Sequence, residues 1–347
     1  MIGYYVHHHG AGHLARAQAI IAHLDTPVTV LSSLPRPSDW PGEWVVLAPD
    51  DRAVQPVDVT ARGSLHWVPR HDHGVRTRAR QITSWIDAAR PALLVVDVSV
   101  EVTMLARLTG TPVVVVAMPG VRDDRPHRTA YDCAEALLAP WPRDFDLGPT
   151  QAEWAAKTWQ VGAFSRFDGR PRIPSPRPGT RGVRRPRALL LWGSGGSEAT
   201  GPMLAEVRSA TPGWSWSLAG PGRQRGPQAL WRELCLADVV VTHAGQNAVA
   251  EVAAAGTPAV VVASPRPFEE QVHTSRALSR HGVAVGLDSW PEPTRWPELL
   301  DRARCMGADR WKSWSYGDGA CRSAAQLDRL AASLSAGSGS SLSRTAV

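Results

Sequence analysis

The chain has no run of apolar residues long enough to cross a membrane. A transmembrane helix needs about 20 consecutive apolar residues, and no stretch of the 347 residues approaches that length. The first residues also lack the basic segment and the following apolar run of a secretory signal peptide. These two absences predict a cytoplasmic protein.

Cysteine is scarce as well, and its spacing excludes two kinds of structural site. The four cysteines, Cys133, Cys235, Cys305 and Cys321, form no Cys-x-x-Cys pair. Paired cysteines are the signature of a zinc ribbon, and a disulfide framework needs a denser set in a shorter chain. We therefore expect neither of them.

Lysine is almost absent, and the positive charge comes from arginine. Lys157 and Lys312 are the only lysines among 38 basic residues, and the net charge is +6. Asp168 is the only acid in residues 165–187, which carry the arginines Arg166, Arg170, Arg172, Arg177, Arg181, Arg184, Arg185 and Arg187. Because the excess charge is local, we expect no nucleic-acid partner. A solvated segment and a peripheral contact with the anionic inner face of the membrane are the two alternatives for it.

Length and patterning indicate two α/β domains. With 43% hydrophobic residues the chain can bury two cores, and strand-like runs alternate with helical patterns throughout. Residues 164–187 are rich in proline and show no apolar period, which predicts an extended linker or exposed loop. We expect an N-terminal domain at 1–163, a C-terminal domain at 188–330 and a disordered tail rich in serine and glycine at 331–347.

Residues 239–271 are the most informative segment. A run of valines ends at a Thr-His-Ala-Gly-Gln-Asn turn, an alanine-rich helix follows, and a second apolar run leads into a polar loop. This order predicts a nucleotide-binding strand–helix–strand unit. A helix that begins near Gly245 leaves its first N–H groups unpaired at the positive end of its dipole, so it can hold a phosphate without a lysine.

Three side chains of this segment suit a sugar nucleotide. His243 and Gln246 can donate to the same phosphate oxygens, and Glu251, farther along the helix, can accept from ribose hydroxyls. The alternative for Glu251 is a solvated helix carboxylate.

The N-terminus begins with a similar pattern. Residues 3–8 resemble a short strand, residues 10–13 read Gly-Ala-Gly-His, and apolar residues recur at helical spacing behind them. Plain turn chemistry is the alternative explanation of such a glycine-rich turn.

These segments together resemble the GT-B glycosyltransferases. The run HAGQNAVAEVAAAGTP followed by FEEQ is similar to the donor-binding signature of family 28, the lipid-II-forming N-acetylglucosaminyltransferases, and more distantly to that of family 1. The resemblance implies contacts to the diphosphate from His243, Gly245, Gln246 and Asn247, to the ribose from Glu251, and to the sugar from Glu270 and Gln271. Family 28 usually has Asp-His-Gln where residues 269–271 read Glu-Glu-Gln.

The first turn resembles the Gly-Gly-His loop of both families, without the proline that often follows. The resemblance implies that Gly12 borders the donor and that His13 is the catalytic base. Such a base needs a partner that fixes its tautomer. Residues 93–96 form a buried-type strand that ends at Asp97, and the carboxyl ends of parallel strands face the ligand crevice. We expect Asp97 to orient His13, the alternative being an N-cap of the helix that begins near Val100.

A third glycine-rich loop follows the apolar strand at residues 188–192. The resemblance implies that Ser194, Gly195 and Gly196 border the diphosphate, a plain turn being the alternative. The next strand, at residues 214–218, precedes Arg223, and there the resemblance implies a contact with the nucleotide base.

Histidines also stand together at residues 7–9. Imidazole is a common metal ligand, but successive residues of a strand point to opposite faces. Three adjacent histidines in a strand therefore do not converge on one ion. We expect no metal here, and no Asp-x-Asp pair is placed to carry one at the diphosphate.

The predicted fold is GT-B, with two Rossmann-like domains facing across a cleft. The resemblance implies an inverting, metal-independent hexosyl transfer from a nucleotide sugar, UDP-linked, to an unidentified acceptor hydroxyl, with a lipid-linked acceptor among the candidates. Bacterial cell-envelope synthesis and glycosylation of a secondary metabolite are both compatible. A UDP-sugar epimerase of the same architecture and a non-catalytic nucleotide-sugar-binding protein are the alternatives. The Gly-x-Gly-x-x-Gly fingerprint of ordinary Rossmann dehydrogenases is absent.

Overall fold

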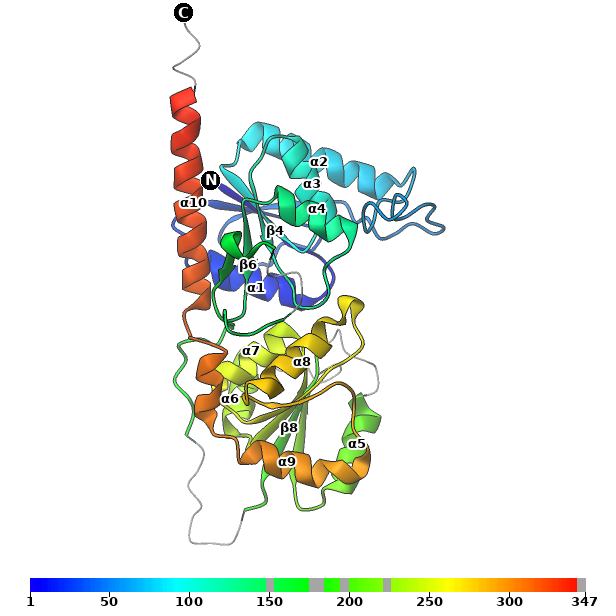
Figure 1. Cartoon of the computed structure of the whole chain (residues 1–347), viewed down its shortest axis with the longest axis vertical. Coiled ribbons are helices and arrows are strands. Elements are labelled where there is room, and N and C mark those ends of the chain that lie inside the picture. The colour runs from blue at the N-terminus through cyan, green and yellow to red at the C-terminus, as the bar shows by residue number, and fades with distance from the viewer. Residues whose placement is uncertain (148–152, 175–183, 194–199, 221–225, 342–347) are drawn as a thin grey trace, which may run out of the picture.

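Two parallel β-sheets, one in each half of the chain, organise the computed structural model (Figure 1). The structure describes residues 1–147, 153–174, 184–193, 200–220 and 226–341. The division into domains at residues 163 and 188 remains our proposal. Among the described residues, no helix has the length and apolar character needed to cross a membrane.

The N-terminal sheet has seven parallel strands in the order β3-β2-β1-β4-β5-β6-β7. The strands are β1 (Ile2–Tyr5), β2 (Val28–Ser32), β3 (Glu43–Val46), β4 (Leu93–Asp97), β5 (Val113–Val116), β6 (Ala136–Ala139) and β7 (Thr158–Gln160). The intervening helices are α1 (Ala11–Ile21), α2 (His73–Ala89), α3 (Val100–Leu108), α4 (Arg125–Cys133) and the 3-10 turn η2 (Ala155–Lys157). Every residue of β4 and β5 is buried, as expected of parallel strands covered on both faces.

The C-terminal sheet has five parallel strands in the order β12-β11-β10-β8-β9. The strands are β8 (Arg187–Leu191), β9 (Ser215–Ala219), β10 (Val239–His243), β11 (Ala259–Val262) and β12 (Val285–Leu287). The helices are α5 (Thr200–Ala210), α6 (Pro227–Leu236), α7 (Gln246–Ala255), α8 (Glu270–Arg280) and α9 (Trp296–Arg304), with 3-10 turns η3 (Pro267–Glu269), η4 (Pro293–Arg295) and η5 (Ala308–Ser313). The predicted α/β class is confirmed.

The sheet registers bring the predicted site loops to one edge. β1 lies between β2 and β4, and Tyr5 at the end of β1 is opposite Val96. The loop that leads to α1 therefore begins beside Asp97, the last residue of β4. Gly3 allows β1 to pack closely against α2, because a Cβ at this position would stand 2.6 Å from the Trp85 ring.

The last helix corrects the expected disordered tail. Helix α10 (Gly319–Ser341) returns to the N-terminal half and runs beside it (Figure 1). Ala320, Ala324, Leu327 and Ala331 are buried in the same core as Ile2. These residues recur at helical spacing and form an apolar stripe, which the surrounding serines and glycines concealed in the sequence. Disorder was thus the wrong prediction for residues 331–341, and residues 342–347 lie outside the described part.

The segment expected to be an extended linker is anchored at its start. Residues 164–174 form no helix or strand, but Phe164 and Phe167 are buried. The Phe167 ring lies 5.2 Å from that of Trp231 in α6, and Trp231 Nε1 donates to the Pro171 carbonyl at 3.3 Å. The exposed-loop prediction is therefore wrong for these positions, because two aromatic side chains among the arginines pack against the protein.

Candidate functional site

The predicted base and its partner are brought together. Helix α1 follows Gly10, whose φ of 95° turns the chain, and His13 Nδ1 lies 3.2 Å from Asp97 Oδ1. Asp97 is fully buried. It does not cap α3, because Ser99 is the N-cap and its side chain accepts from the Val102 N–H. The structure thus decides against the capping alternative and keeps Asp97 available to His13.

Arg16 completes this pair, and the sequence analysis missed it. Its Nη2 donates to Asp97 Oδ1 at 2.7 Å and lies 3.0 Å from His13 Nδ1. Burial alone would raise the pKa of Asp97, but Arg16 and His13 outweigh it and hold that pKa at about 2. Asp97 is therefore a carboxylate at neutral pH. The available signal was the three-residue spacing from His13, which places Arg16 on the same helix face.

The tautomer of His13 decides which neighbour bonds its Nδ1, because Asp97 and Arg16 both lie beside that nitrogen. Asp97 Oδ1 accepts from Arg16 at 2.7 Å, and it lies 3.2 Å from His13 Nδ1, from which it accepts only in the tautomer that carries the hydrogen on Nδ1. Arg16 Nη2 has a second hydrogen, which it donates to Nδ1 only in the other tautomer, the one with the hydrogen on Nε2. With Nδ1 protonated, Nε2 keeps a free lone pair. This is the state in which a histidine can accept a proton.

The turn after β10 presents donors without a lysine. Gly245 is the N-cap of α7 and has no side-chain cap, so the first N–H groups of the helix stay available. The Gly245 N–H donates to His243 Nδ1 at 3.0 Å, which puts the imidazole hydrogen on Nε2. Among the described residues His243 Nε2 has no hydrogen-bond partner, although it is buried. Burial, followed by the charge of Arg266, lowers the pKa of His243 to about 4, so the ring is neutral at pH 7.

Glycines allow this turn to be tight. A Cβ at Gly245 would overlap the His243 ring, and one at Gly193 would stand 2.9 Å from His243 Nε2. The end of β8 and the end of β10 therefore approach each other closely. Ser194, Gly195, Gly196 and Arg223 lie outside the described residues, and their expected contacts stay predictions.

Helix α7 meets the His13 turn across the two halves of the chain. Arg16 Nη1 donates to Gln246 Oε1 at 2.5 Å. A Cβ at Gly12 would stand 2.6 Å from Asn247 Nδ2. Gln246 Nε2 is buried and has no partner within the described part of the chain. The expected donor residues and the expected base therefore face the same space.

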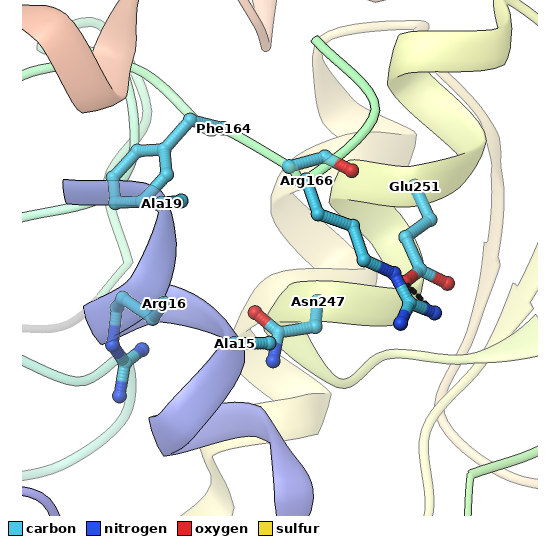
Figure 2. Close-up of a pocket in the computed structure, with 8 residues that line it drawn as sticks. Ala15, Arg16, Ala19, Phe164, Arg166, Asn247 and Glu251 are labelled. Atoms are coloured by element: carbon cyan, nitrogen blue, oxygen red, sulfur yellow. Dashed lines mark ion pairs between the residues drawn. The ribbon is translucent and has the colours of Figure 1, made fainter. Parts of the chain in front are cut away.

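Glu251 lies in a pocket lined by α1, α7 and residues 164–166 (Figure 2). Its carboxylate is paired with Arg166, whose Nη2 is 2.8 Å from Glu251 Oε1. Burial raises the pKa of Glu251, and Arg166 offsets part of that rise. The side chain is 12% exposed, so it is not the solvated helix carboxylate of the alternative reading.

The two residues expected at the sugar are held differently. Glu270 begins α8, and its Oε2 accepts from Arg122 Nη2 at 3.0 Å. Gln271 is buried, and its Oε1 accepts from the Ser264 N–H at 3.0 Å. Glu270 is therefore linked to the N-terminal half, whereas Gln271 fixes the loop after β11.

A backbone contact reinforces the link at Glu270. The Val121 N–H donates to the Phe268 carbonyl at 2.8 Å, and the Arg122 guanidinium lies 4.5 Å from the centre of the Phe268 ring. Gly120, at φ 99°, is needed there because a Cβ would overlap that carbonyl. Arg122 was not assigned from the sequence, since its partners are far along the chain.

Comparison with known proteins finds similarity to glycosyltransferases. Residues 232–302 match the family model "Glycosyltransferase family 28 C-terminal domain", a segment that includes the His243 turn, Glu251 and Glu270. A curated relative from Gloeobacter violaceus is the UDP-N-acetylglucosamine--N-acetylmuramyl-(pentapeptide) pyrophosphoryl-undecaprenol N-acetylglucosamine transferase. It is 30% identical over 177 residues, which are 43% of this chain and 48% of the relative. The chain spans about half the length of the curated relatives it matches.

Solved structures give the fold over the whole chain. CalG4, the calicheamicin glycosyltransferase, matches with a TM-score of 0.65 at 17% identity and covers 100% of this chain and 99% of its own. MurG of Acinetobacter baumannii matches with a TM-score of 0.58 at 14% identity, covering 96% and 99%. The protein has the two-domain GT-B fold. Within that class, the predicted resemblance to family 28 is confirmed, and the matched family model lies in the C-terminal half.

Proposed function

We propose that this protein is an inverting glycosyltransferase that uses a nucleotide-sugar donor and an acceptor hydroxyl. The observation that carries the proposal is the Arg16 contact. Arg16 joins the His13–Asp97 pair of the N-terminal half to Gln246 at the phosphate-type turn of the C-terminal half. The proposed base and the proposed diphosphate site are adjacent, which supports a displacement at the anomeric carbon.

The proposed reaction moves one proton and one glycosyl group. His13 Nε2 takes the proton of the acceptor hydroxyl while that oxygen forms a bond to the anomeric carbon. The bond from this carbon to the diphosphate oxygen breaks, and its electron pair leaves with the nucleoside diphosphate. Asp97 stabilises the charged imidazole that results. Attack opposite to the leaving group inverts the configuration.

The leaving diphosphate is stabilised by fixed donors in this proposal. The free N–H groups at the start of α7, His243 Nε2–H and Gln246 Nε2 supply them, and Asn247 lies beside them. Preorganised donors of this kind lower a barrier because they need no reorientation as charge develops. No metal at the diphosphate is part of the proposal.

The donor assignment extends from this turn. Glu251 binds the ribose, Glu270 and Gln271 contact the sugar, and Gly12 borders the donor. UDP is the nucleotide that the name of the Gloeobacter relative indicates. That name also describes a lipid-linked acceptor, which makes a polyprenyl-diphosphate sugar the first acceptor to try. Cytoplasmic location and peripheral membrane contact through residues 165–187 stay predictions.

A turnover assay tests the proposal and separates it from its alternatives. The full chain is incubated with UDP-sugars, with and without polyprenyl-diphosphate-linked sugars and small aromatic alcohols. Release of UDP that requires an acceptor, with a new glycoside, supports transfer. Conversion of the sugar without any acceptor identifies an epimerase, and binding of UDP without either reaction identifies a non-catalytic protein.

A further inference from the structure

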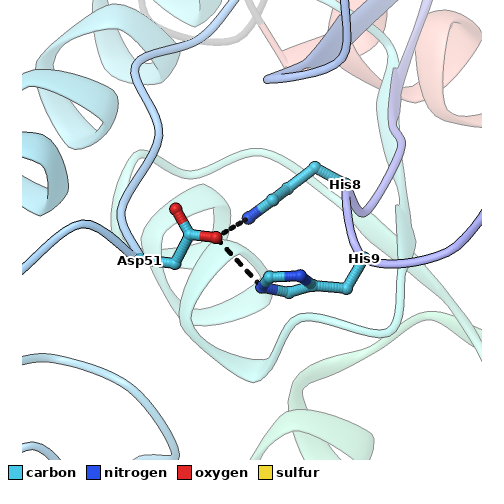
Figure 3. A group of neighbouring side chains, drawn as sticks. All are labelled: His8, His9 and Asp51. Atoms are coloured by element: carbon cyan, nitrogen blue, oxygen red, sulfur yellow. Dashed lines mark ion pairs between the residues drawn. The ribbon is translucent and has the colours of Figure 1, made fainter. Parts of the chain in front are cut away.

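The histidines at residues 7–9 are arranged differently from the prediction. β1 ends at Tyr5, so the alternation of a strand does not extend to His8 and His9. Their ring centres are 4.1 Å apart with planes tilted by 41°. Both rings point Nε2 toward the carboxylate of Asp51, which comes from the segment after β3 (Figure 3). Two of the three histidines therefore converge on one acidic side chain.

The separations suit a shared ion better than hydrogen bonds. His8 Nε2 and His9 Nε2 lie 3.4 Å and 3.5 Å from Asp51 Oδ2. An N–H···O hydrogen bond is normally about 2.7–3.2 Å, so both contacts are long. Ligands at about 2.0–2.2 Å from a tetrahedral zinc ion stand about 3.3–3.6 Å apart. One atom from each of the three residues lies within 4.8 Å of the others.

His8 supplies an independent observation. Its Nε2 is buried and has no hydrogen-bond partner within the described part of the chain, and its side chain is 11% exposed. Asp50 Oδ1 lies 3.6 Å from the same nitrogen and adds negative charge. The orphaned nitrogen is therefore aimed at a place that favours a cation.

Arg78 is a cation beside these residues that must be accommodated. Its Nη2 lies 3.4 Å from His8 Nδ1, which carries the hydrogen when Nε2 binds a metal. Arg78 is already held by Tyr5 at 2.7 Å, by Asp50 at 3.1 Å and by Ser33. It can give up the long contact to Nδ1 without losing these partners.

We propose that His8, His9 and Asp51 bind one divalent transition-metal ion of the zinc class. The His9 and Asp51 side chains are 62% and 36% exposed, so the fourth coordination position is open to water or to a bound molecule. His7 lies between this place and the proposed base, with ring centres 5.4 Å from His13 and 5.1 Å from His8. The ion therefore belongs to the acceptor side of His13, and the residues proposed for the diphosphate do not hold it.

A second group in the N-terminal half shows that close ligand atoms alone do not indicate a metal site. His66, Asp124 and His127 also bring ligand atoms within 4.8 Å. Here the atoms are already hydrogen-bonded, with His66 Nε2 at 3.0 Å and His127 Nδ1 at 2.5 Å from Asp124. Arg122 Nη1 lies 3.1 Å from the remaining nitrogen of His127. A metal would have to break this network, so the second group serves as an internal control.

Cobalt titration of the full chain tests the proposal. After treatment with a chelator, Co²⁺ should give the visible absorption of a tetrahedral site at one equivalent, and Zn²⁺ should displace it. His9→Ala and Asp51→Asn should each weaken Co²⁺ binding by at least about 100-fold, since even outer-shell partners are worth about 10–100-fold. Both side chains are at the surface, and circular dichroism checks that the variants fold.

His66→Ala and His23→Ala are the matched controls, and both should bind Co²⁺ as the wild type does. His66 belongs to the hydrogen-bonded group, and His23 is exposed after α1. No absorption with the wild type, unchanged binding in His9→Ala, or an equal loss in His66→Ala would each overturn the proposal. UDP binding of the same variants is measured separately and should not change, so a failure here is distinct from a failure of the proposed transfer.

Discussion

The two sides of the pocket between α1 and α7 are built in different ways. On the α7 side, donors come from consecutive residues, namely the His243 side chain and the N–H groups that follow Gly245. On the α1 side, His13 works only with Asp97 and Arg16, which strands and helices bring together from separate segments. The donor side is thus a local motif, whereas the proposed catalytic side is a product of the fold. Substitutions on the two sides should therefore differ in their effects.

The largest effect is expected for His13→Ala. Loss of the general base should reduce transfer by about 10²–10⁴-fold, while UDP affinity stays unchanged because the donor turn lies on the other side. Turnover and UDP binding are measured on the same preparation. His23→Ala, an exposed histidine after α1, is the control and should retain full activity. Undiminished turnover in His13→Ala would show that another group is the base.

Arg16→Gln tests the dependence of the α1 side on a distant partner. The variant leaves the buried Asp97 carboxylate without its cation, and breaking a buried pair costs about 3–5 kcal/mol of unfolding free energy. Urea unfolding measures the loss. Arg276→Gln, at an ion pair whose side chains are 60% and 50% exposed, is the matched control and should leave the unfolding free energy almost unchanged. Equal effects would mean that Arg16 is not needed at the buried pair.

Low pH should destabilise the folded protein through the buried Asp97 carboxylate on the α1 side. Because the pKa of Asp97 is about 2 when folded, below its unfolded value, the unfolded state binds more protons in this range. The contribution of Asp97 to the free energy of unfolding is about 2 kcal/mol by the linkage relation. It is fully present above about pH 4 and is lost as the pH falls toward 2. Unfolding free energies at pH 6 and pH 3 are compared for the wild type and Asp97→Asn. A pH dependence identical in both would contradict the assigned carboxylate.

The smallest effect is expected where the two halves touch at Glu270. Arg122→Gln removes a largely buried ion pair, in which the side chains of Arg122 and Glu270 are 5% and 23% exposed, and the contact with Phe268. Because Glu270 keeps access to water, the loss should be about 1–2 kcal/mol of stability, less than for a fully buried pair, and KM for the donor should rise more than kcat falls. Arg128→Gln, at the exposed pair with Glu153, is the control. A change in kcat alone would instead place Arg122 at the reacting atoms.

The difference between the α1 side and the α7 side also explains which parts of the site the sequence could predict. The turn at residues 243–247 was predictable because a strand, a glycine and a helix in succession determine its geometry. The proximity of His13 to Asp97 was predictable because neighbouring parallel strands end at the same edge of a sheet. The contacts of Arg16 were not predictable, because its partners Asp97 and Gln246 are 81 and 230 residues away in the sequence. The proximity of the His8 and His9 rings was not predicted, because the strand was assumed to continue past Tyr5.

The prediction of a disordered tail failed for a similar reason, because the partners of α10 are also remote in the sequence. Composition predicted disorder after residue 330, yet helix α10 packs against α1, and its apolar stripe is buried in the core of the N-terminal half. Likewise, Phe167 looks isolated among arginines until Trp231 is placed against it. In both cases the stabilising surface comes from a remote segment, which a local pattern does not contain.

The most direct test of the central claim is a calorimetric titration of the full chain with UDP, dTDP, GDP and NAD. We predict that UDP binds and that Glu251→Gln weakens it by about 10–100-fold, the loss of a charged hydrogen bond to ribose. The exposed Glu298→Gln should bind as the wild type does. No binding of any nucleoside diphosphate, or equal UDP affinity in Glu251→Gln and the wild type, would contradict a donor site at α7.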